Sequence, residues 1–143
     1  MSLTEQTRAD VVRYRTERAS IALDQAKRNL ADHCLEVTAN RLYYAAYYAV
    51  TALLVANRIP THSHSGCIGQ FGRYMVQGGR VSREDGKLLS LLFSLRMTGD
   101  YSDRFNLTEE EVLPYVGPTE DFIRRICDMA LADILKDDNP TLQ

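Results

Sequence analysis

The sequence has no tryptophan and contains only three cysteines and four prolines in 143 residues. Because the cysteines are odd in number and form no Cys-x-x-Cys pair, they indicate neither a disulfide framework nor a structural zinc site. We expect free, buried thiols, as in a protein of the reducing cytoplasm. The three residues are Cys34, Cys67 and Cys127.

Long apolar runs are also missing. No stretch approaches the roughly 20 apolar residues that a membrane-spanning helix requires, and the first ten residues, MSLTEQTRAD, lack the apolar core of a signal peptide. We therefore expect one cytoplasmic domain over residues 1–143, without a membrane partner. Its folded core should cover about residues 10–136, followed by a loose tail at residues 137–143.

Most familiar catalytic signatures are absent. The sequence holds no glycine-rich phosphate loop, no His-Glu-x-x-His, no Gly-x-Ser-x-Gly and no calcium-binding loop. Three scattered histidines do not form a metal site, so we expect neither a metal nor another cofactor. The net charge is −2, but basic residues outnumber acidic ones between residues 41 and 104. A polyanion should therefore meet this middle segment rather than the acidic C-terminal part.

Apolar residues recur with helical periodicity along the chain, and no alternating run is long enough to indicate a half-buried strand. The pattern predicts a first helix at residues 4–32, open to one break where Tyr14-Arg15-Thr16 interrupts its apolar stripe. Further helices are predicted at residues 36–57, 65–76 and 82–100, with a short helix from Thr108 that Pro114 ends and a last helix from Pro118. Helices joined by short loops favour an all-α, up-and-down antiparallel bundle of four to five helices.

The second predicted helix carries the segment Asn40-Arg41-Leu42-Tyr43-Tyr44-Ala45-Ala46-Tyr47-Tyr48-Ala49. A helix that is apolar over so much of its circumference is central in a bundle or shared with a partner subunit. Tyr43 and Tyr47 suit core or dimer packing. Tyr44 and Tyr48 lie one turn apart and nearer the face of Arg41, so their hydroxyls could line a cleft.

Three groups of polar residues stand on or beside these apolar helices. Arg41 with Asn40 is either a helix-end arginine bound to a neighbouring acceptor or a phosphate-binding group. Arg96 and Asp100 have the spacing of an intrahelical ion pair, yet Arg96 ends a very apolar helix and needs a partner or a wet cleft. His64 is either a cap or a surface residue, or the nearby group suited to proton transfer at neutral pH.

Taken in order, several of these residues are similar to a known family. Asn40-Arg41-x-Tyr43-Tyr44-Ala45, Ala52-Leu53-Leu54, His64-x-Gly66, Phe71, Gly78 or Gly79, and Arg96-x-x-x-Asp100-Tyr101 resemble the small stand-alone prokaryotic HEPN (higher eukaryotes and prokaryotes nucleotide-binding) proteins. The resemblance covers about residues 10–136. It implies a bundle of four or five helices that is usually dimeric and often encoded beside a minimal nucleotidyltransferase, the two forming a toxin–antitoxin pair.

The resemblance also implies roles for individual residues. Active HEPN toxins are metal-independent ribonucleases in which an arginine is followed four to six residues later by a histidine, paired across the dimer. Arg96 takes the place of that arginine, whereas Asp100 stands in the histidine position and no histidine follows. A carboxyl group with a usual pKa of about 3.9 is a poor proton donor at neutral pH and repels phosphate.

The sequence therefore favours a HEPN-type module that acts by binding, as a homodimer and with a nucleotidyltransferase-like antitoxin. Its ligand is a nucleotide, RNA or protein partner rather than DNA, held in a cleft lined by Arg41, His64 and Arg96. Further expected ligand-binding residues are Asn40, Tyr44, Tyr48 and Tyr101.

Two alternatives remain open. The first is an active ribonuclease in which Arg96 binds phosphate, Asp100 lies in the catalytic group, and His64 supplies acid or base if its loop folds back beside Arg96. The second is a helical oligomerisation domain without a ligand, in which the polar residues point apart.

Overall fold

The computed structural model describes residues 4–101 and 106–137, and these contain no β-strand. The elements in chain order are α1 (Glu5–Ala31), α2 (Leu35–Ala56), α3 (His64–Gln70), a π-helical segment η1 (Phe71–Val76), α4 (Arg83–Tyr101), α5 (Glu109–Val112), a 3-10 turn η2 (Leu113–Tyr115) and α6 (Val116–Asp137). The predicted all-α bundle is confirmed. Apart from Asp137, the predicted tail lies outside the described residues.

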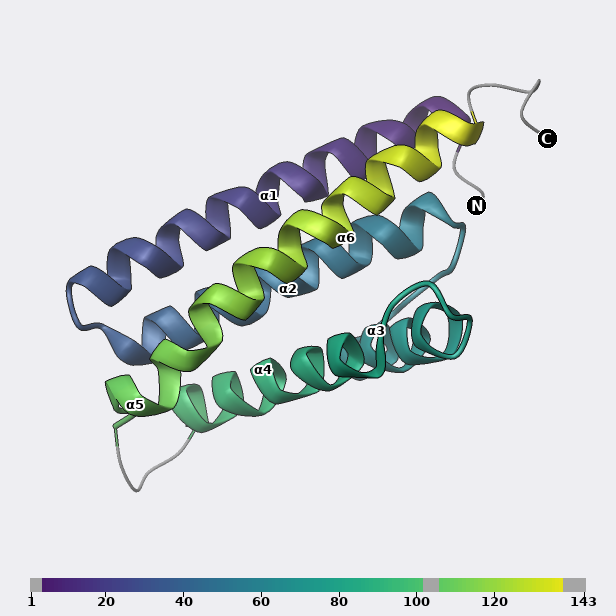
Figure 1. Ribbon diagram of the computed structural model, residues 1–143. Helices are drawn as coiled ribbons and strands as arrows, with labels where there is room; N and C mark the ends of the chain where they lie inside the picture. Colours follow the sequence, from purple (N-terminus) through teal and green to yellow (C-terminus); the bar gives the residue numbers. More distant parts are fainter. Residues whose placement is uncertain (1–3, 102–105, 138–143) are drawn as a thin grey trace.

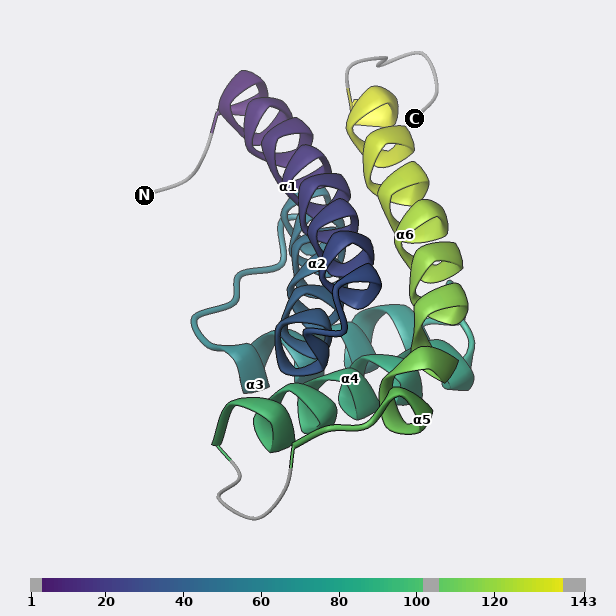
Figure 2. The same ribbon diagram turned by 90° about the vertical axis from the view of Figure 1, so that its left-hand side faces the viewer.

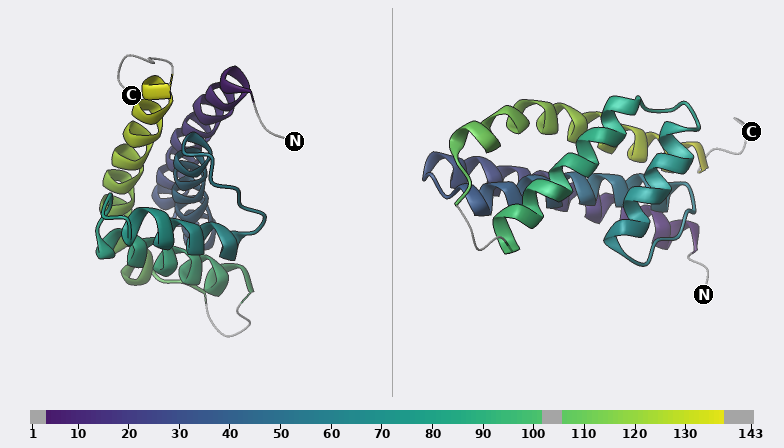
Figure 3. Two further views of the ribbon diagram at one scale, coloured as in Figure 1. Left: turned by 90° about the vertical axis from the view of Figure 1, so that its right-hand side faces the viewer. Right: turned by 90° about the horizontal axis from the view of Figure 1, so that it is seen from below.

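Helix α2 lies at the centre of the bundle. Helices α1 and α6 run along one side of it, and α4 packs across the opposite side. Figures 1 and 2 show that α1 and α2 are antiparallel neighbours, and that α1 begins at the end of the bundle where α6 finishes. Seen from below in Figure 3, α4 crosses α2 obliquely. One helix thus contacts the other long helices, as its broad apolar surface requires.

Small residues allow these helices to approach closely. The side of α2 that carries Ala45, Ala46 and Ala49 is fully buried, and α1 contributes a buried stripe that includes Ala19 and Ala22. Helix separation depends on the side chains at the contact, so two alanine faces bring the backbones together. The larger side chains of α2, including the fully buried Tyr43, fill the remaining interior.

Polar caps fix several helix starts where the sequence predicts them. The Thr4 hydroxyl accepts a hydrogen bond from the Thr7 amide at 3.1 Å. Ser82 and Asp85 cap each other at the start of α4, since each backbone amide donates to the other's side chain (3.3 and 3.1 Å). Such reciprocal bonds satisfy amides that have no partner within the helix.

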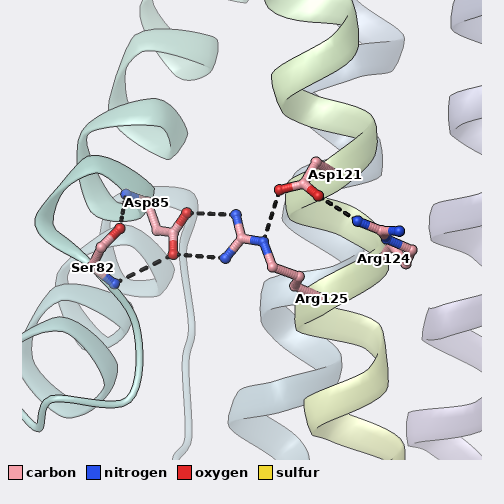
Figure 4. Close-up of polar contacts among 5 residues, drawn as sticks. All are labelled: Ser82, Asp85, Asp121, Arg124 and Arg125. Carbon is pink, nitrogen blue, oxygen red and sulfur yellow. Dashed lines mark hydrogen bonds and ion pairs between the residues drawn. The ribbon is translucent and has the colours of Figure 1, made fainter.

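A pair of charged residues ties α4 to α6. Both terminal nitrogens of the Arg125 guanidinium donate to the Asp85 carboxylate, at 2.9 and 3.0 Å, while Arg125 Nε donates to Asp121. Figure 4 shows this arrangement, with Asp85 also held by Ser82. The Asp85 side chain is buried, whereas Arg125 is partly exposed. The contact thus joins two helices that otherwise touch little.

Two predicted features differ from the structure: the possible break in the first helix and the start of the last helix. Helix α1 is unbroken, because Val12 and Ala19 keep the buried stripe continuous while Tyr14 points outward. Helix α5 ends at Val112, before Pro114 as predicted; the chain then passes Pro114 in a 3-10 turn, and α6 begins at Val116, ahead of the predicted start at Pro118. Proline is tolerated there because first-turn amides have no helical acceptor.

The third predicted helix is present, but its second half is π-helical. It ends where predicted, at Gly78 and Gly79. Gly79 has φ +79°, and a Cβ on Gly78 would collide with the Tyr74 carbonyl, so both positions need glycine.

The cysteines are all free thiols, but they differ in burial. Cys67 is buried and Cys127 half-buried, and burial raises the pKa of each thiol to about 12. Cys34 is exposed, which corrects the expectation that all three are buried. Its position just before α2, at the turn after α1, explains the exposure. Within the described residues, no helix is both long and apolar enough to cross a membrane.

Candidate functional site

The histidine loop folds back onto the tyrosines of α2. Ser63 caps α3 by accepting a hydrogen bond from the Gly66 amide at 2.9 Å, which places His64 in the first turn. His64 Nδ1 lies 2.7 Å from the Tyr43 hydroxyl. The imidazole also stacks on Tyr47, with ring centroids 4.4 Å apart. His64 is therefore held in one orientation by α2.

Burial sets the protonation of this pair. Burial raises the pKa of Tyr43 well above its ordinary value, so the phenol stays protonated and either donates to Nδ1 or accepts from it. Burial, and then the nearby charge of Arg96, lowers the pKa of His64. At neutral pH His64 is thus a neutral imidazole, with one ring nitrogen held by Tyr43.

Arg96 lies over two rings of the same group, those of Tyr43 and Tyr44. Its guanidinium carbon is 5.1 Å from the centre of the Tyr44 ring and 5.7 Å from that of Tyr43. Arg96 Nε donates to Asp100 at 3.1 Å, one helical turn later, and the Arg96 side chain is only 13% exposed. The predicted ion pair is therefore present, but it sits on an aromatic surface rather than in open solvent.

Asn40 and Arg41 extend this arrangement along α2. Asn40 Nδ2 donates to the Asp100 carboxylate at 3.0 Å, and the Asn40 carbonyl accepts from Arg41 at 3.0 and 2.7 Å. The Arg41 guanidinium carbon lies 5.1 Å from the Tyr44 ring centre, the same distance as that of Arg96. Two arginines from different helices thus share one tyrosine.

We call this group of side chains the tyrosine–arginine cluster; its members are Asn40, Arg41, Tyr43, Tyr44, Tyr47, Tyr48, His64, Arg96 and Asp100. It brings together most of the residues predicted from the sequence. Tyr101 stands at its edge, exposed and 5.9 Å from the Arg96 guanidinium carbon, and the Tyr48 ring lies 6.1 Å from that of Tyr44.

Two α1 residues join the cluster without having been predicted. Gln25 accepts a hydrogen bond from Arg41 at 3.2 Å, and the Arg18 guanidinium carbon lies 5.5 Å from the Tyr48 ring centre. The two are seven residues apart and so share one helical face. That spacing is the signal available in the sequence, but nothing there shows that this face turns toward the tyrosines.

Among the described residues, no three His, Cys, Asp or Glu side chains gather closely enough to hold a metal ion. The side chains present instead offer two guanidinium groups, a neutral imidazole and several aromatic rings. These are the groups that bind phosphate and stack on bases.

Comparison with known proteins shows the family of the chain. Residues 12–129 match the HEPN domain. The chain belongs to the HEPN domain family. A UPF0332 protein of Thermotoga maritima is 37% identical over 116 residues, covering 81% of this chain and 88% of that protein. A protein of Methanocaldococcus jannaschii named "Putative toxin" is 34% identical over 95 residues, covering 66% of this chain and 69% of its own length.

A UPF0332 protein of Gloeobacter violaceus is also similar, with 41% identity over 78 residues, 54% of this chain and 62% of that protein. The HEPN match includes every residue of the tyrosine–arginine cluster. In this HEPN chain Asp100 stands four residues after Arg96 and accepts a hydrogen bond from it. The imidazole of the cluster belongs to His64 of α3.

Proposed function

We propose that this HEPN protein binds single-stranded RNA, or the nucleotides of which RNA is built, on the tyrosine–arginine cluster. The observation that carries the proposal is the shared ring of Tyr44, which has Arg41 and Arg96 at equal distance and His64 beside it. A planar guanidinium binds phosphate oxygens through two parallel hydrogen bonds. A half-exposed aromatic ring offers a face for a base, with about 1–3 kcal/mol per stacked base.

The protein partners belong to the same proposal. The relatives named as toxins support a role in a toxin–antitoxin pair. In such a pair this chain acts as a homodimer, and a minimal nucleotidyltransferase is the antitoxin, as the family resemblance implies. The broad apolar surface of α2 is already covered by α1, α4 and α6, so the dimer uses another face.

Fluorescence anisotropy with an end-labelled single-stranded RNA of about eight nucleotides tests the binding. We expect Arg96→Ala to weaken binding at least about tenfold, because it removes a charged contact worth about 1.5–3 kcal/mol. Arg124→Ala is the matched control, since it removes an exposed arginine of α6 far from the cluster in sequence. Circular dichroism should show equal helix content in all three proteins. No binding by the wild-type protein, or equal loss in both variants, would contradict the proposal.

A second candidate function, ribonuclease activity, is favoured by the position of His64 beside the rings that hold Arg96. In this reaction the RNA 2′-oxygen loses its proton to a base and attacks the adjacent phosphorus, and the 5′-oxygen leaves with a proton from an acid. His64 is neutral at pH 7 and suits the base, while Arg96 balances the phosphate charge.

Induced expression in a bacterial host tests this candidate. An active ribonuclease arrests growth, and His64→Ala and Arg96→Ala each relieve the arrest although the protein is still produced. If the wild-type protein leaves growth unchanged, or if both variants arrest growth equally well, the protein is not a ribonuclease toxin.

A further inference from the structure

The cluster continues from α2 onto α1. The Tyr48 ring lies 6.1 Å from that of Tyr44 and 6.0 Å from that of Tyr47, and the Arg18 guanidinium carbon lies over it, 5.5 Å from the ring centre. Arg18 also forms a hydrogen bond with Tyr48, which raises the pKa of the guanidinium. The arrangement of Arg96 on Tyr44 is thereby repeated one ring further along α2.

The charges of α1 at this point are not neutralised. Arg15 and Arg18 form no ion pair with any of the described residues, whereas Arg13, on a different face of α1, pairs with Asp10. Arg15 also lies near Tyr47, since its charge opposes the rise that burial causes in the pKa of that tyrosine. An arginine held at a half-buried ring without a carboxylate retains its full attraction for an anion.

Arginine–aromatic contacts are concentrated here. The described residues hold six, and five of them involve the rings of Tyr43, Tyr44, Tyr48 and Tyr101. Three of these five contacts are made by Arg96, and the other two by Arg41 and Arg18.

From this placement we infer that Arg18 and Tyr48 form a second RNA subsite, so that the protein binds a strand of several nucleotides rather than a single nucleotide. The inference rests on the proposed function. Each successive unit of a single strand offers one phosphate and one base. The Arg96–Tyr44 pair takes one unit, and the Arg18–Tyr48 pair takes a later unit of the same strand. Arg15 adds positive charge beside the second unit.

The length of the RNA provides the test. Binding of labelled single-stranded RNAs of about two and about eight nucleotides is measured at several salt concentrations for wild type, Arg18→Gln and Arg13→Gln. Arg13→Gln removes the same charge from α1 outside the proposed subsite. We expect Arg18→Gln to weaken binding of the longer RNA at least about fivefold. The slope of log affinity against log salt concentration should become smaller by about 0.7, the value for one phosphate of a single strand. The affinity for the dinucleotide should be the same in Arg18→Gln as in the wild type.

Variants of Tyr48 separate stacking from charge. Tyr48→Phe keeps the ring and should retain binding of the longer RNA, whereas Tyr48→Leu should weaken it to a similar degree as Arg18→Gln. If Arg18→Gln and Arg13→Gln behave alike at both lengths while Arg96→Ala loses binding, the second subsite is wrong and the proposed function stands. If the wild-type protein binds neither RNA, the proposed function itself is overturned.

Discussion

Asp100 occupies the Nε donor of Arg96, one of the groups through which a guanidinium binds phosphate. Its carboxylate accepts from Arg96 Nε at 3.1 Å and from Asn40 Nδ2 at 3.0 Å. A ligand phosphate therefore competes with a carboxylate already in place, and the repulsion between the two anions weakens binding. The same residue also keeps the Arg96 side chain on the Tyr44 ring before a ligand arrives.

This competition predicts tighter binding when the charge of Asp100 is removed. Asp100→Asn keeps the size and the hydrogen-bonding carbonyl but not the negative charge. We expect the affinity for single-stranded RNA to rise about threefold to tenfold, as measured by anisotropy. Asp121→Asn, on the surface of α6, is the control and should change affinity little. Weaker binding by Asp100→Asn would mean that the carboxylate chiefly positions Arg96.

The lowered pKa of His64 predicts a pH-dependent stability. The unfolded chain has an ordinary histidine pKa of about 6.5, so below that pH the unfolded state binds more protons than the folded state. The free energy of unfolding should therefore decrease as the pH falls from about 7 through the lower folded pKa of His64. Urea unfolding at about pH 7.5, 6.5 and 5.5 measures this decrease.

The variant His64→Gln supplies the comparison, because carboxylates that contribute at acid pH remain in both proteins. Its stability should vary less between pH 7.5 and 5.5 than that of the wild type. Equal slopes in the two proteins would show that His64 titrates normally in the folded state.

At the level of helices and turns, most of the structure follows from local signals in the sequence. Thr4, Ser82 and Thr108 begin helices where predicted, because each hydroxyl caps an amide that the helix leaves unpaired. The π-helical segment and the unbroken α1 could not be predicted, because contacts with other helices decide them: η1 packs on α3 and α4, and α1 packs on α2. The short helix ends before Pro114, as predicted, but the last helix begins at Val116 rather than at Pro118, because a proline also suits the first turn of a helix.

Gly79 offers a direct test of the turn that ends η1. Its φ of +79° lies in the left-handed region, where an alanine side chain costs about 1–2 kcal/mol. We expect Gly79→Ala to lower the free energy of unfolding by that amount in chemical denaturation. Gly69→Ala is the matched control in α3, where a Cβ meets no neighbour, and it should be neutral or stabilising. Equal effects of the two changes would contradict this account of the turn.

At the scale of the whole molecule, the site depends on four helices meeting at the tyrosines of α2. The sequence indicated Arg41, His64 and Arg96 individually, from their residue types and from the family resemblance. It could not show that the α3 loop folds back to Tyr43, nor that Arg18 reaches Tyr48, because both contacts join segments distant in the chain. The homodimer and the nucleotidyltransferase partner stay predictions.

The contact between α4, which carries Arg96, and α6 should contribute strongly to the stability of the fold. Asp85→Ala removes the hydrogen bond from the Ser82 amide and both hydrogen bonds from Arg125, which is the largest cause of the lowered pKa of Asp85. We expect a loss of about 2–4 kcal/mol in the free energy of unfolding, since the charged hydrogen bonds to a buried carboxylate are lost together with one capping bond. Asp121→Ala breaks only exposed contacts and should cost less than about 1 kcal/mol. Equal losses would show that the Asp85 contact does not hold the two helices together.

The central claim, that the tyrosine–arginine cluster binds RNA, is tested most directly by locating the ligand on the protein. Two-dimensional NMR of the labelled protein, titrated with single-stranded RNA of about eight nucleotides, follows the His64 imidazole and the rings of Tyr44 and Tyr48. The account predicts that these signals shift together and saturate with the same affinity, while signals of the exposed face of α6 around Arg124 stay in place. Saturable binding that shifts the α6 signals and leaves His64 and the tyrosines unchanged would contradict it.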